Sequence, residues 1–276
     1  MILQYQPGTT VFSVHLILGF FLALLLSLIS KSLNLLTKSG SIAAFILAFL
    51  IFGFGGWKWT IPVLSFFIVS SLISRIREKK NPSVNIYFEK SGSRDFYQVA
   101  ANGGLGGILV VLNYFFPDKI WFYSYSAIIA SSCSDTWATE IGTLTYHNTY
   151  NIFTFMKVEP GSSGGVSAAG FSGALLGASF ISIISVLWID EHPLDFIILV
   201  TVAGFAASIF DTFIGETLQV QYKCSECKRI VDKEIHCGKK AVKFRGINFI
   251  TNDFVNLTAG LLGGLIVFFY ISLMTK

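Results

Sequence analysis

The stretch VFSVHLILGFFLALLLSLIS, residues 11–30, decides the class of fold. A helix needs about 20 predominantly apolar residues to cross the hydrocarbon core of a bilayer. This stretch has that length, and His15 is its only ionisable side chain. No basic segment precedes it, so we interpret it as a membrane span and not as a cleavable signal peptide. We expect His15 to be packed or hydrogen-bonded within the protein.

The composition of the whole chain agrees with this interpretation. Charged residues make up 13% of the 276 residues, about half of their share in a soluble domain, and 53% are hydrophobic. These proportions exclude a soluble enzyme, a disordered segment and a secreted disulfide scaffold. The apolar runs are continuous, whereas a transmembrane β-barrel would show short alternating segments.

We therefore predict an all-α, polytopic membrane bundle that forms a single membrane domain over residues 1–276. The expected spans, about eight, cover residues 11–30, 40–56, 59–74, 96–116, 120–142, 166–189, 194–220 and 249–274. The second and third meet at Trp57-Lys58-Trp59, which we interpret as an interfacial anchor on a tight hairpin.

The basic residues predict the orientation. All of the 20 Lys and Arg residues except Lys58, Lys119 and Lys276 fall in alternate connections, on one side of the predicted bundle. The positive-inside rule places that side in the cytoplasm and both termini outside. We expect an integral, multi-pass protein of a bacterial or archaeal type of inner membrane. The basic face either follows from this rule and from contact with anionic lipid, or it binds an anionic substrate.

Acidic residues lie where a membrane protein normally has none. Asp135, Glu140, Asp211, Glu216 and Asp253 fall at the inner ends of predicted spans, and ionisable groups in such places suggest a functional site. The pattern D-T-aromatic-x-x-E occurs at 135–140 and again at 211–216. Ala169–Gly173 and Ala259–Gly263 repeat A-G-x-x-G in the span that follows each motif. This indicates a two-span internal repeat.

Carboxylates at one depth favour a hard cation. We expect Asp135, Asp211 and Asp253 to be ligands of Mg²⁺, which proteins hold through a few carboxylates together with water and phosphate. Residues five apart differ by about 140° around a helix, so Asp and Glu of one motif do not share a face. We therefore expect Glu140 and Glu216 to belong to the catalytic residues, either as further metal ligands or as carboxylates that support the metal ligands. The alternative is that these acids form ion pairs with Lys and Arg of the loops.

Glycines and side-chain amides lie at the same depth in the predicted bundle as the acidic residues. The loop Pro160–Gly165 can bring backbone N–H groups to a phosphate, although no Gly-Lys-Ser/Thr follows as in a Walker A motif. Glycines deeper in the spans, at 106, 107, 173, 177, 263 and 264, are more typical of close helix packing. Asn252 and Asn256 share a helix face and either bind substrate or metal or tie helices together. The expected substrate- and nucleotide-binding residues are Lys90, Arg94, Asn102, Gly161, Ser163, Gly164, Gly165, Asn252 and Asn256.

Three of the four cysteines lie in a Cys- and Lys-rich insertion, residues 221–247. Cys224, Cys227, His236 and Cys237 read C-x2-C-x8-H-C, which suggests a zinc knuckle in a reducing cytoplasm. The adjacent His and Cys are irregular for such a site, so plain reduced thiols are the alternative. Cys133 lies in a span and is expected to be an inert buried side chain.

A known family shares these motifs. K-x3-R-x3-Q-V-x-A-N-G from Lys90, S-D-T-W-A-x-E-I-G from Ser134, G-G-V-S from Gly164, D-T-x2-G-x-T-L-Q from Asp211 and N-D-x2-N from Asn252 resemble the membrane family that contains plant phytyl-phosphate kinase and eukaryotic transmembrane protein 19. The resemblance covers most of the chain from about residue 30. It implies phosphorylation of a prenyl monophosphate to the diphosphate, with CTP as donor. It also suggests kinship with dolichol kinase and CDP-lipid synthases.

The predicted partners are a prenyl monophosphate lipid, CTP and membrane lipid, and no nucleic acid is expected. In this interpretation Asp135, Asp211 and Asp253 hold Mg²⁺, while Lys90, Arg94 and the Gly161–Gly165 loop bind phosphates. The acceptor is already ionised, so no strong general base is required. Three alternatives stay open: a cytidylyltransferase acting on a lipid phosphate, a transporter or scramblase, and a scaffold whose zinc loop binds a protein.

Overall fold

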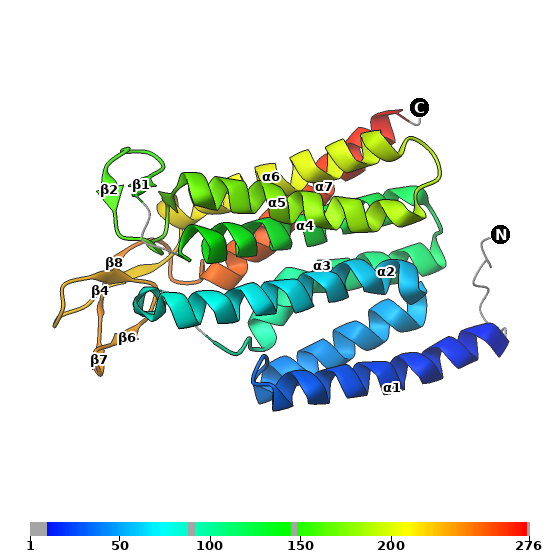
Figure 1. The fold of residues 1–276 in the computed structure, drawn as a ribbon, viewed down its shortest axis with the longest axis horizontal. Coiled ribbons are helices and arrows are strands. Elements are labelled where there is room, and N and C mark those ends of the chain that lie inside the picture. The colour runs from blue at the N-terminus through cyan, green and yellow to red at the C-terminus, as the bar shows by residue number, and fades with distance from the viewer. Residues whose placement is uncertain (1–9, 88–91, 145–147, 275–276) are drawn as a thin grey trace.

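The computed structural model describes residues 10–87, 92–144 and 148–274, and these form a bundle of seven α-helices (Figure 1). The helices are α1 (Thr10–Ser32), α2 (Lys38–Lys80), α3 (Phe96–Phe115), α4 (Lys119–Gly142), α5 (Ala168–Ser185), α6 (Pro193–Thr217) and α7 (Asn252–Met274), with two short 3-10 turns, η1 (Pro82–Ile86) and η2 (Val186–Trp188). The predicted all-α membrane bundle is confirmed.

Short polar side chains fix where several helices begin. Asp95 accepts a hydrogen bond from the backbone N–H of Gln98 at the start of α3, and the Gln98 side chain accepts one in return from the Asp95 N–H. The Asp118 side chain accepts from the Ile120 N–H at the start of α4, and the Ser167 side chain accepts from the Gly170 N–H at the start of α5, so one N–H group at each of these helix starts gains a partner. Because α3 and α5 begin beside the polar loops, these caps set the level at which the loops meet the bundle.

The helix α2 is broken at Gly56. The backbone of Gly56 has φ 64° and ψ −158°, and the chain turns back on itself there, so α2 consists of two arms that match the predicted spans 40–56 and 59–74 (Figure 1). By length and composition, α1, α2, α5 (continued by η2), α6 and α7 qualify as membrane spans. The predicted number of eight spans is not confirmed.

The helix α4 is the most enclosed element of the bundle. It contacts α2, α3, α5, α6 and α7, and its buried serines include Ser126, Ser131 and Ser134. A helix surrounded by protein does not need the apolar surface that lipid requires, which explains how α4 can be polar and still lie inside a membrane bundle.

Glycines let the neighbouring helices approach α4. A Cβ atom at Gly173 or Gly177 of α5 would lie 2.5 Å from the Trp137 carbonyl oxygen or 2.7 Å from that of Cys133. Gly264 of α7 meets the side chain of Ile128, and Gly106 of α3 meets the ring of Tyr125. Gly107 and Gly263 also lie against neighbouring helices. The predicted packing role of these glycines is confirmed.

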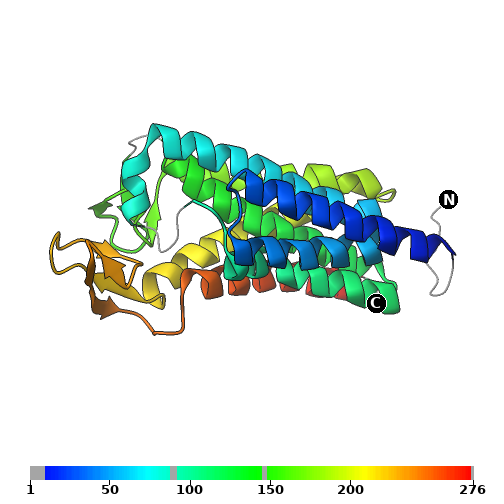
Figure 2. The same ribbon diagram turned by 90° about the horizontal axis from the view of Figure 1, so that it is seen from below.

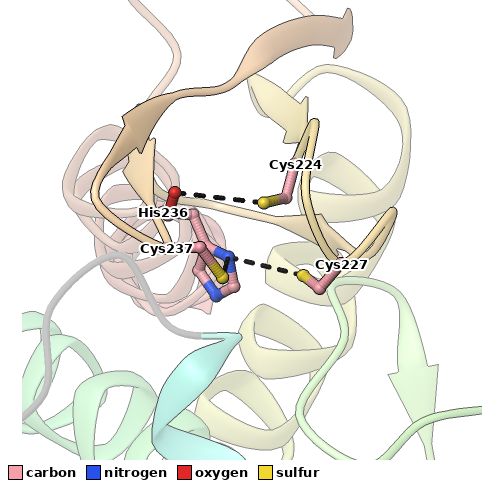
Figure 3. A group of neighbouring side chains, drawn as sticks. All are labelled: Cys224, Cys227, His236 and Cys237. Carbon is pink, nitrogen blue, oxygen red and sulfur yellow. Dashed lines mark hydrogen bonds between the residues drawn. The ribbon is translucent and has the colours of Figure 1, made fainter.

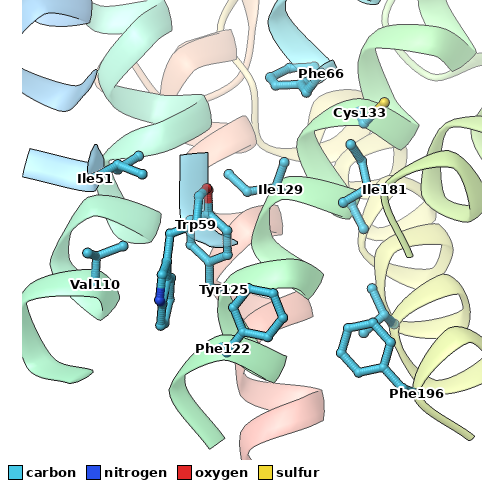
Figure 4. Close-up of a cluster of buried hydrophobic side chains, with 12 residues drawn as sticks. Ile51, Trp59, Phe66, Val110, Phe122, Tyr125, Ile129, Cys133, Ile181 and Phe196 are labelled. Atoms are coloured by element: carbon cyan, nitrogen blue, oxygen red, sulfur yellow. The ribbon is translucent and has the colours of Figure 1, made fainter. Parts of the chain in front are cut away.

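Buried hydrophobic side chains, several of them aromatic, pack into a cluster between the helices (Figure 4). The ring of Trp59 lies 5.1 Å from that of Phe122 and 4.9 Å from that of Tyr125, and the Tyr125 hydroxyl donates to the Trp59 carbonyl oxygen. Trp59 is buried, so the prediction that it lies at the membrane interface is wrong. Trp57, which is 51% exposed, remains suited to that role.

All strands lie at one end of the bundle (Figures 1 and 2). The strands β1 (Thr149–Asn151), β2 (Lys157–Val158) and β3 (Gly165–Val166) form one sheet in the order β2-β1-β3. The 221–247 insertion contains β4 (Gln221–Lys223), β5 (Ile230–Val231), β6 (Ile235–His236), β7 (Lys239–Lys240) and β8 (Val242–Arg245), paired as β5-β4-β8 and β6-β7. The start of α1 and the end of α7 lie at the opposite end, as an even number of crossings requires.

Candidate functional site

A polar cavity of about 310 Å³ lies at the strand-bearing end, where helices α2 to α7 meet the glycine loop. Most of the residues predicted for the site line it: Arg94, Asn102, Asp135, Glu140, Gly161, Ser163, Gly164, Gly165, Asp211, Asn252, Asp253 and Asn256. These residues come from four helices, α3, α4, α6 and α7, and from loops far apart in the sequence. The shared depth that the sequence indicated therefore corresponds to a single cavity.

The two aspartates of the repeated motif occupy corresponding places. Asp135 lies near the end of α4 and Asp211 near the end of α6, and their carboxylates are close enough to repel each other. Asp211 Oδ2 and Asn256 Oδ1 are buried, and neither has a hydrogen-bond partner among the residues that the structure describes. A buried oxygen without a partner is costly. Asp135 and Asp253 lie in the same lining, and carboxylate and amide oxygens are the ligands that a hard cation such as Mg²⁺ prefers, although the three aspartates do not form a close group of metal ligands among the described residues.

The two glutamates of the repeated motif are each held by an arginine. Glu140 accepts from Arg77 Nε at 2.7 Å and from the Ser74 hydroxyl at 2.7 Å. Glu216 forms a two-pronged pair with Arg245, with N···O distances of 2.7 and 2.5 Å. Glu140 lines the cavity, whereas Glu216 lies behind it against Gly164. Both pairs join a helix end to another element, so they set the shape of the cavity wall.

The glycine loop adopts backbone conformations that favour glycine. Gly161 has φ 87° and Gly164 has φ 75°, and a Cβ atom at Gly164 would lie 2.2 Å from Glu216 Oε2. The Gly164 carbonyl oxygen accepts from the Ile152 N–H at 2.9 Å, which ties the loop to the β1–β3 sheet. The Ser163 hydroxyl donates to both carboxylate oxygens of Asp232, at 3.1 and 3.0 Å. The insertion therefore holds this loop at the edge of the cavity.

Positive charge at the cavity comes from three arginines, one before α3 and two on α2. Arg94 lines the cavity and donates to the Ser71 hydroxyl at 2.7 Å. Its backbone N–H donates to Leu35 and its carbonyl oxygen accepts from Thr37, so the connection between α1 and α2 is tied to the start of α3. Arg75 and Arg77 of α2 also line the cavity. Lys90, predicted to bind phosphate, lies outside the described residues.

The amide side chains differ in their surroundings. Asn102 donates through Nδ2 to the carbonyl oxygen of Gln98, one turn earlier on α3, at 3.0 Å. The backbone carbonyl oxygen of Asn102 accepts from the Ser132 hydroxyl of α4 at 3.0 Å. Asn252 begins α7 and Asn256 follows one turn later, and both line the cavity. Asn102 thus ties α3 to α4, while the Asn256 side-chain oxygen has no hydrogen-bond partner among the described residues.

Sequence reasoning missed several residues of the lining. Ser74 and Arg77 of α2 are three apart and face Glu140, a spacing that places both on one helix face. That face could have been found by extending the helix beyond its apolar part. Asp232 lies in an irregular loop with no periodic signal, so only the folded chain shows that it meets Ser163.

The four cysteine and histidine side chains of the insertion that were predicted as zinc ligands converge at a separate point (Figure 3). Their ligand atoms all lie within 4.8 Å of one another, and this is the one such group among the described Cys, His, Asp and Glu residues. Backbone N–H groups, Cys227's first, and the His236 ring lower the pKa of the Cys224 thiol to about 6. The thiolate form binds metal, so this environment suits a ligand. Cys133, in contrast, is buried in the bundle core, as predicted.

Known proteins are similar in sequence to this chain along most of its length. The family model described as integral membrane protein DUF92 matches residues 21–264. Protein PGR of Arabidopsis thaliana is 29% identical over 256 residues, which cover 84% of this chain and 86% of that protein. An uncharacterized membrane protein of Methanocaldococcus jannaschii is 27% identical over 253 residues, covering 92% of this chain and 93% of the relative.

A cyanobacterial relative extends the match. An uncharacterized membrane protein of Synechocystis is 31% identical over 208 residues, covering 74% of this chain and 79% of the relative. No solved structure matches the chain. The family resemblance that the motifs indicated is confirmed, and the chain belongs to the integral membrane protein family DUF92.

Proposed function

We propose that the protein is a Mg²⁺-dependent kinase that transfers the γ-phosphoryl group of CTP to a prenyl monophosphate, such as phytyl phosphate, and releases the diphosphate and CDP. The observation that carries this proposal is the cavity, whose lining contains arginines, a glycine loop and two buried oxygens that have no hydrogen-bond partner among the described residues. Phosphoryl transfer requires positioning and charge stabilisation more than covalent chemistry by the protein, and these groups supply both.

The metal would be held by Asp135, Asp211 and Asp253 together with the Asn256 oxygen. When bound, Mg²⁺ neutralises charge on the β- and γ-phosphates of the nucleotide. The buried Asp211 Oδ2 and Asn256 Oδ1 support this assignment, because a cation would give each the partner that it lacks among the described residues.

The remaining lining residues would position the two phosphate groups. Arg94 and the Gly161–Gly165 loop are assigned to the triphosphate, and the bond from Ser163 to Asp232 keeps the loop in place. An oxygen of the prenyl phosphate attacks the γ-phosphorus, and the bond from that phosphorus to the β,γ-bridging oxygen breaks, with its electrons passing to CDP. The attacking oxygen is already ionised, so no side chain needs to remove a proton.

The acceptor's tail would lie along the α5–α6 face. Phe171 of α5 and Ile209 of α6 are apolar members of the cavity lining. Leu175 follows Phe171 by one helical turn and is exposed, so an apolar path continues from the cavity along α5. A lipid phosphate suits this arrangement, with its head in the cavity and its tail against α5 and α6.

Product analysis tests the reaction. Purified protein with CTP, Mg²⁺ and prenyl phosphates of several chain lengths is expected to form CDP and prenyl diphosphate in equal amounts, without pyrophosphate. EDTA should stop the reaction, and excess Mg²⁺ should restore it. Mass spectrometry identifies both products.

Other products would redirect the assignment. Stoichiometric pyrophosphate together with a CDP-linked lipid would replace the kinase with a cytidylyltransferase at the same cavity. If neither product forms and the protein instead moves lipid or ions across vesicle membranes, the enzymatic proposal is refuted.

The proposed cytoplasmic position of the cavity predicts a labelling pattern. Met156 lies between β1 and β2 at the cavity end, and His192 lies between α5 and α6 at the other end; both side chains are exposed. A membrane-impermeant maleimide added to intact cells should label His192→Cys, and should label Met156→Cys only after permeabilisation. The unmutated protein is the control, because its exposed Cys227 and Cys237 lie at the cavity end. Labelling of Met156→Cys in intact cells would reverse the orientation.

A further inference from the structure

The geometry points to a structural zinc site formed by Cys224, Cys227, His236 and Cys237, which fastens the glycine loop to the cavity. The zinc site itself is independent of the proposed function. The fastening of the glycine loop matters for catalysis only if the proposed function is correct. The fastening can nevertheless be measured without any assay of that function.

The distances between the ligand atoms suit a tetrahedral zinc ion. His236 Nδ1 lies 3.6 Å from Cys227 Sγ and 3.3 Å from Cys237 Sγ, and Cys224 Sγ completes a group whose members are all within 4.8 Å of one another (Figure 3). Zinc bonds of about 2.3 Å to sulfur and about 2.0–2.1 Å to nitrogen, at tetrahedral angles, separate sulfur and nitrogen by roughly 3.5 Å. Only small adjustments are needed for all four atoms to reach one ion.

A tight turn explains how adjacent residues can both be ligands. His236 pairs with Lys239 across the β6–β7 hairpin, so Cys237 and Gly238 form a two-residue loop. Both have positive φ, 52° and 74°, as the hairpin turn with two left-handed residues requires. The left-handed Cys237 turns its side chain toward the His236 ring. This turn explains how the adjacent His236 and Cys237, whose spacing is irregular for a zinc site, can both reach one ion.

The other two ligands come from a second turn. Cys224 directly follows β4. Its N–H donates to the Arg229 carbonyl oxygen at 2.9 Å, and its carbonyl oxygen accepts from the Lys228 N–H at 3.1 Å. Lys228 has φ 61°, and this conformation closes the loop that carries Cys227 toward Cys224. Two hairpin turns, each contributing two ligands, therefore face a common point, and a metal there would cross-link β4–β5 to β6–β7.

The cross-linked strands contact the cavity wall. Asp232 follows β5 and accepts from Ser163 of the glycine loop, while its N–H donates to the Tyr87 carbonyl oxygen at 3.2 Å. Lys233 donates to the Asn85 carbonyl oxygen at 3.0 Å, and Arg245 of β8 pairs with Glu216 of α6. The insertion thus connects the glycine loop, the end of α6 and the segment after α2. Since these strands are only two to four residues long, zinc would supply the rigidity that they lack.

Metal content tests the zinc site. Protein purified without chelators is expected to contain one zinc ion per chain by elemental mass spectrometry. Cys224→Ser/Cys227→Ser should lose it, while Cys133→Ser, which changes the buried cysteine of α4, should keep it. Cobalt exchanged into the unmutated protein should give a thiolate-to-cobalt charge-transfer band, a measurement that does not depend on how the variants fold. Zinc no higher in the unmutated protein than in the double variant, with no cobalt band, would overturn the site.

Hydrogen exchange tests the fastening. Removal of zinc by a chelator should increase deuterium uptake in a peptide over residues 157–167 as well as in the insertion, and should leave a peptide over 119–129 of α4 unchanged. Increased uptake confined to 224–240 would overturn the connection to the loop. Neither measurement uses CTP or a prenyl phosphate, so the kinase proposal can fail while this inference stands, and the reverse also holds.

Discussion

Asp211→Asn is expected to reduce turnover of CTP and prenyl phosphate by roughly 10²–10³-fold while the protein stays folded, because it removes one preorganised charge from the site of phosphoryl transfer. Asp211 is buried, and its Oδ2 lacks a partner among the described residues, so its charge is not used to hold the bundle together. Asparagine keeps the shape of the side chain. Turnover is measured as CDP release, and folding as the melting temperature in detergent.

The matched control lies on the same helix. Asp195→Asn makes the same chemical change at the opposite end of α6, where the side chain is 78% exposed and pairs with His192, so turnover should be unchanged. Asp135→Asn, the corresponding change in α4, should resemble Asp211→Asn. If Asp211→Asn keeps ordinary activity, or if it loses activity only together with its fold, the assignment of this cavity as the reaction site is contradicted.

The bundle could be predicted because its helices obey a simple rule. Apolar stretches of membrane length become helices whatever their neighbours are, so the ends of α1, α3, α5 and α7 lie close to the predicted ones. Trp59 shows where this rule stops. Its position beside Lys58 suggested the interface, but the break at Gly56 turns its ring inward against Phe122 and Tyr125.

The depth of the acidic residues in the bundle could also be predicted from the sequence, but their individual hydrogen-bond partners could not. Sequence position places Asp135, Glu140, Asp211 and Glu216 near helix ends, and the first three of these line the cavity. Which residue meets which depends on how the helices pack. The alternative that the acids pair with basic residues holds for Glu140, but the sequence did not single out Arg77 as its partner, and the bond from Ser163 to Asp232 had no sequence signal. The adjacent zinc ligands depended likewise on the left-handed backbone of Cys237, which residue spacing does not reveal.

The second large effect is expected at the pair Arg77–Glu140. Arg77→Ala should lower the free energy of unfolding by about 3 kcal/mol, because it leaves the Glu140 carboxylate, whose side chain is only 12% exposed, without its cation. The Arg77 side chain is 3% exposed, and its Nε lies 2.7 Å from Glu140 Oε2. Stability is measured by denaturant unfolding in mixed detergent micelles.

A double variant separates the effect of the lost ion pair from the effect of lost packing. Arg77→Met/Glu140→Leu removes both charges and keeps much of the volume, so its stability should lie closer to the unmutated protein than that of Arg77→Ala. Lys240→Ala is the exposed control: its ammonium lies 3.0 Å from Glu234 in solvent, and the change should cost at most about 1 kcal/mol. Equal losses for Arg77→Ala and the double variant would mean that packing, and not an unpaired carboxylate, accounts for the effect. In that case the ion pair between Glu140 and Arg77 would not stabilise the protein, and it would not determine the shape of this wall of the cavity.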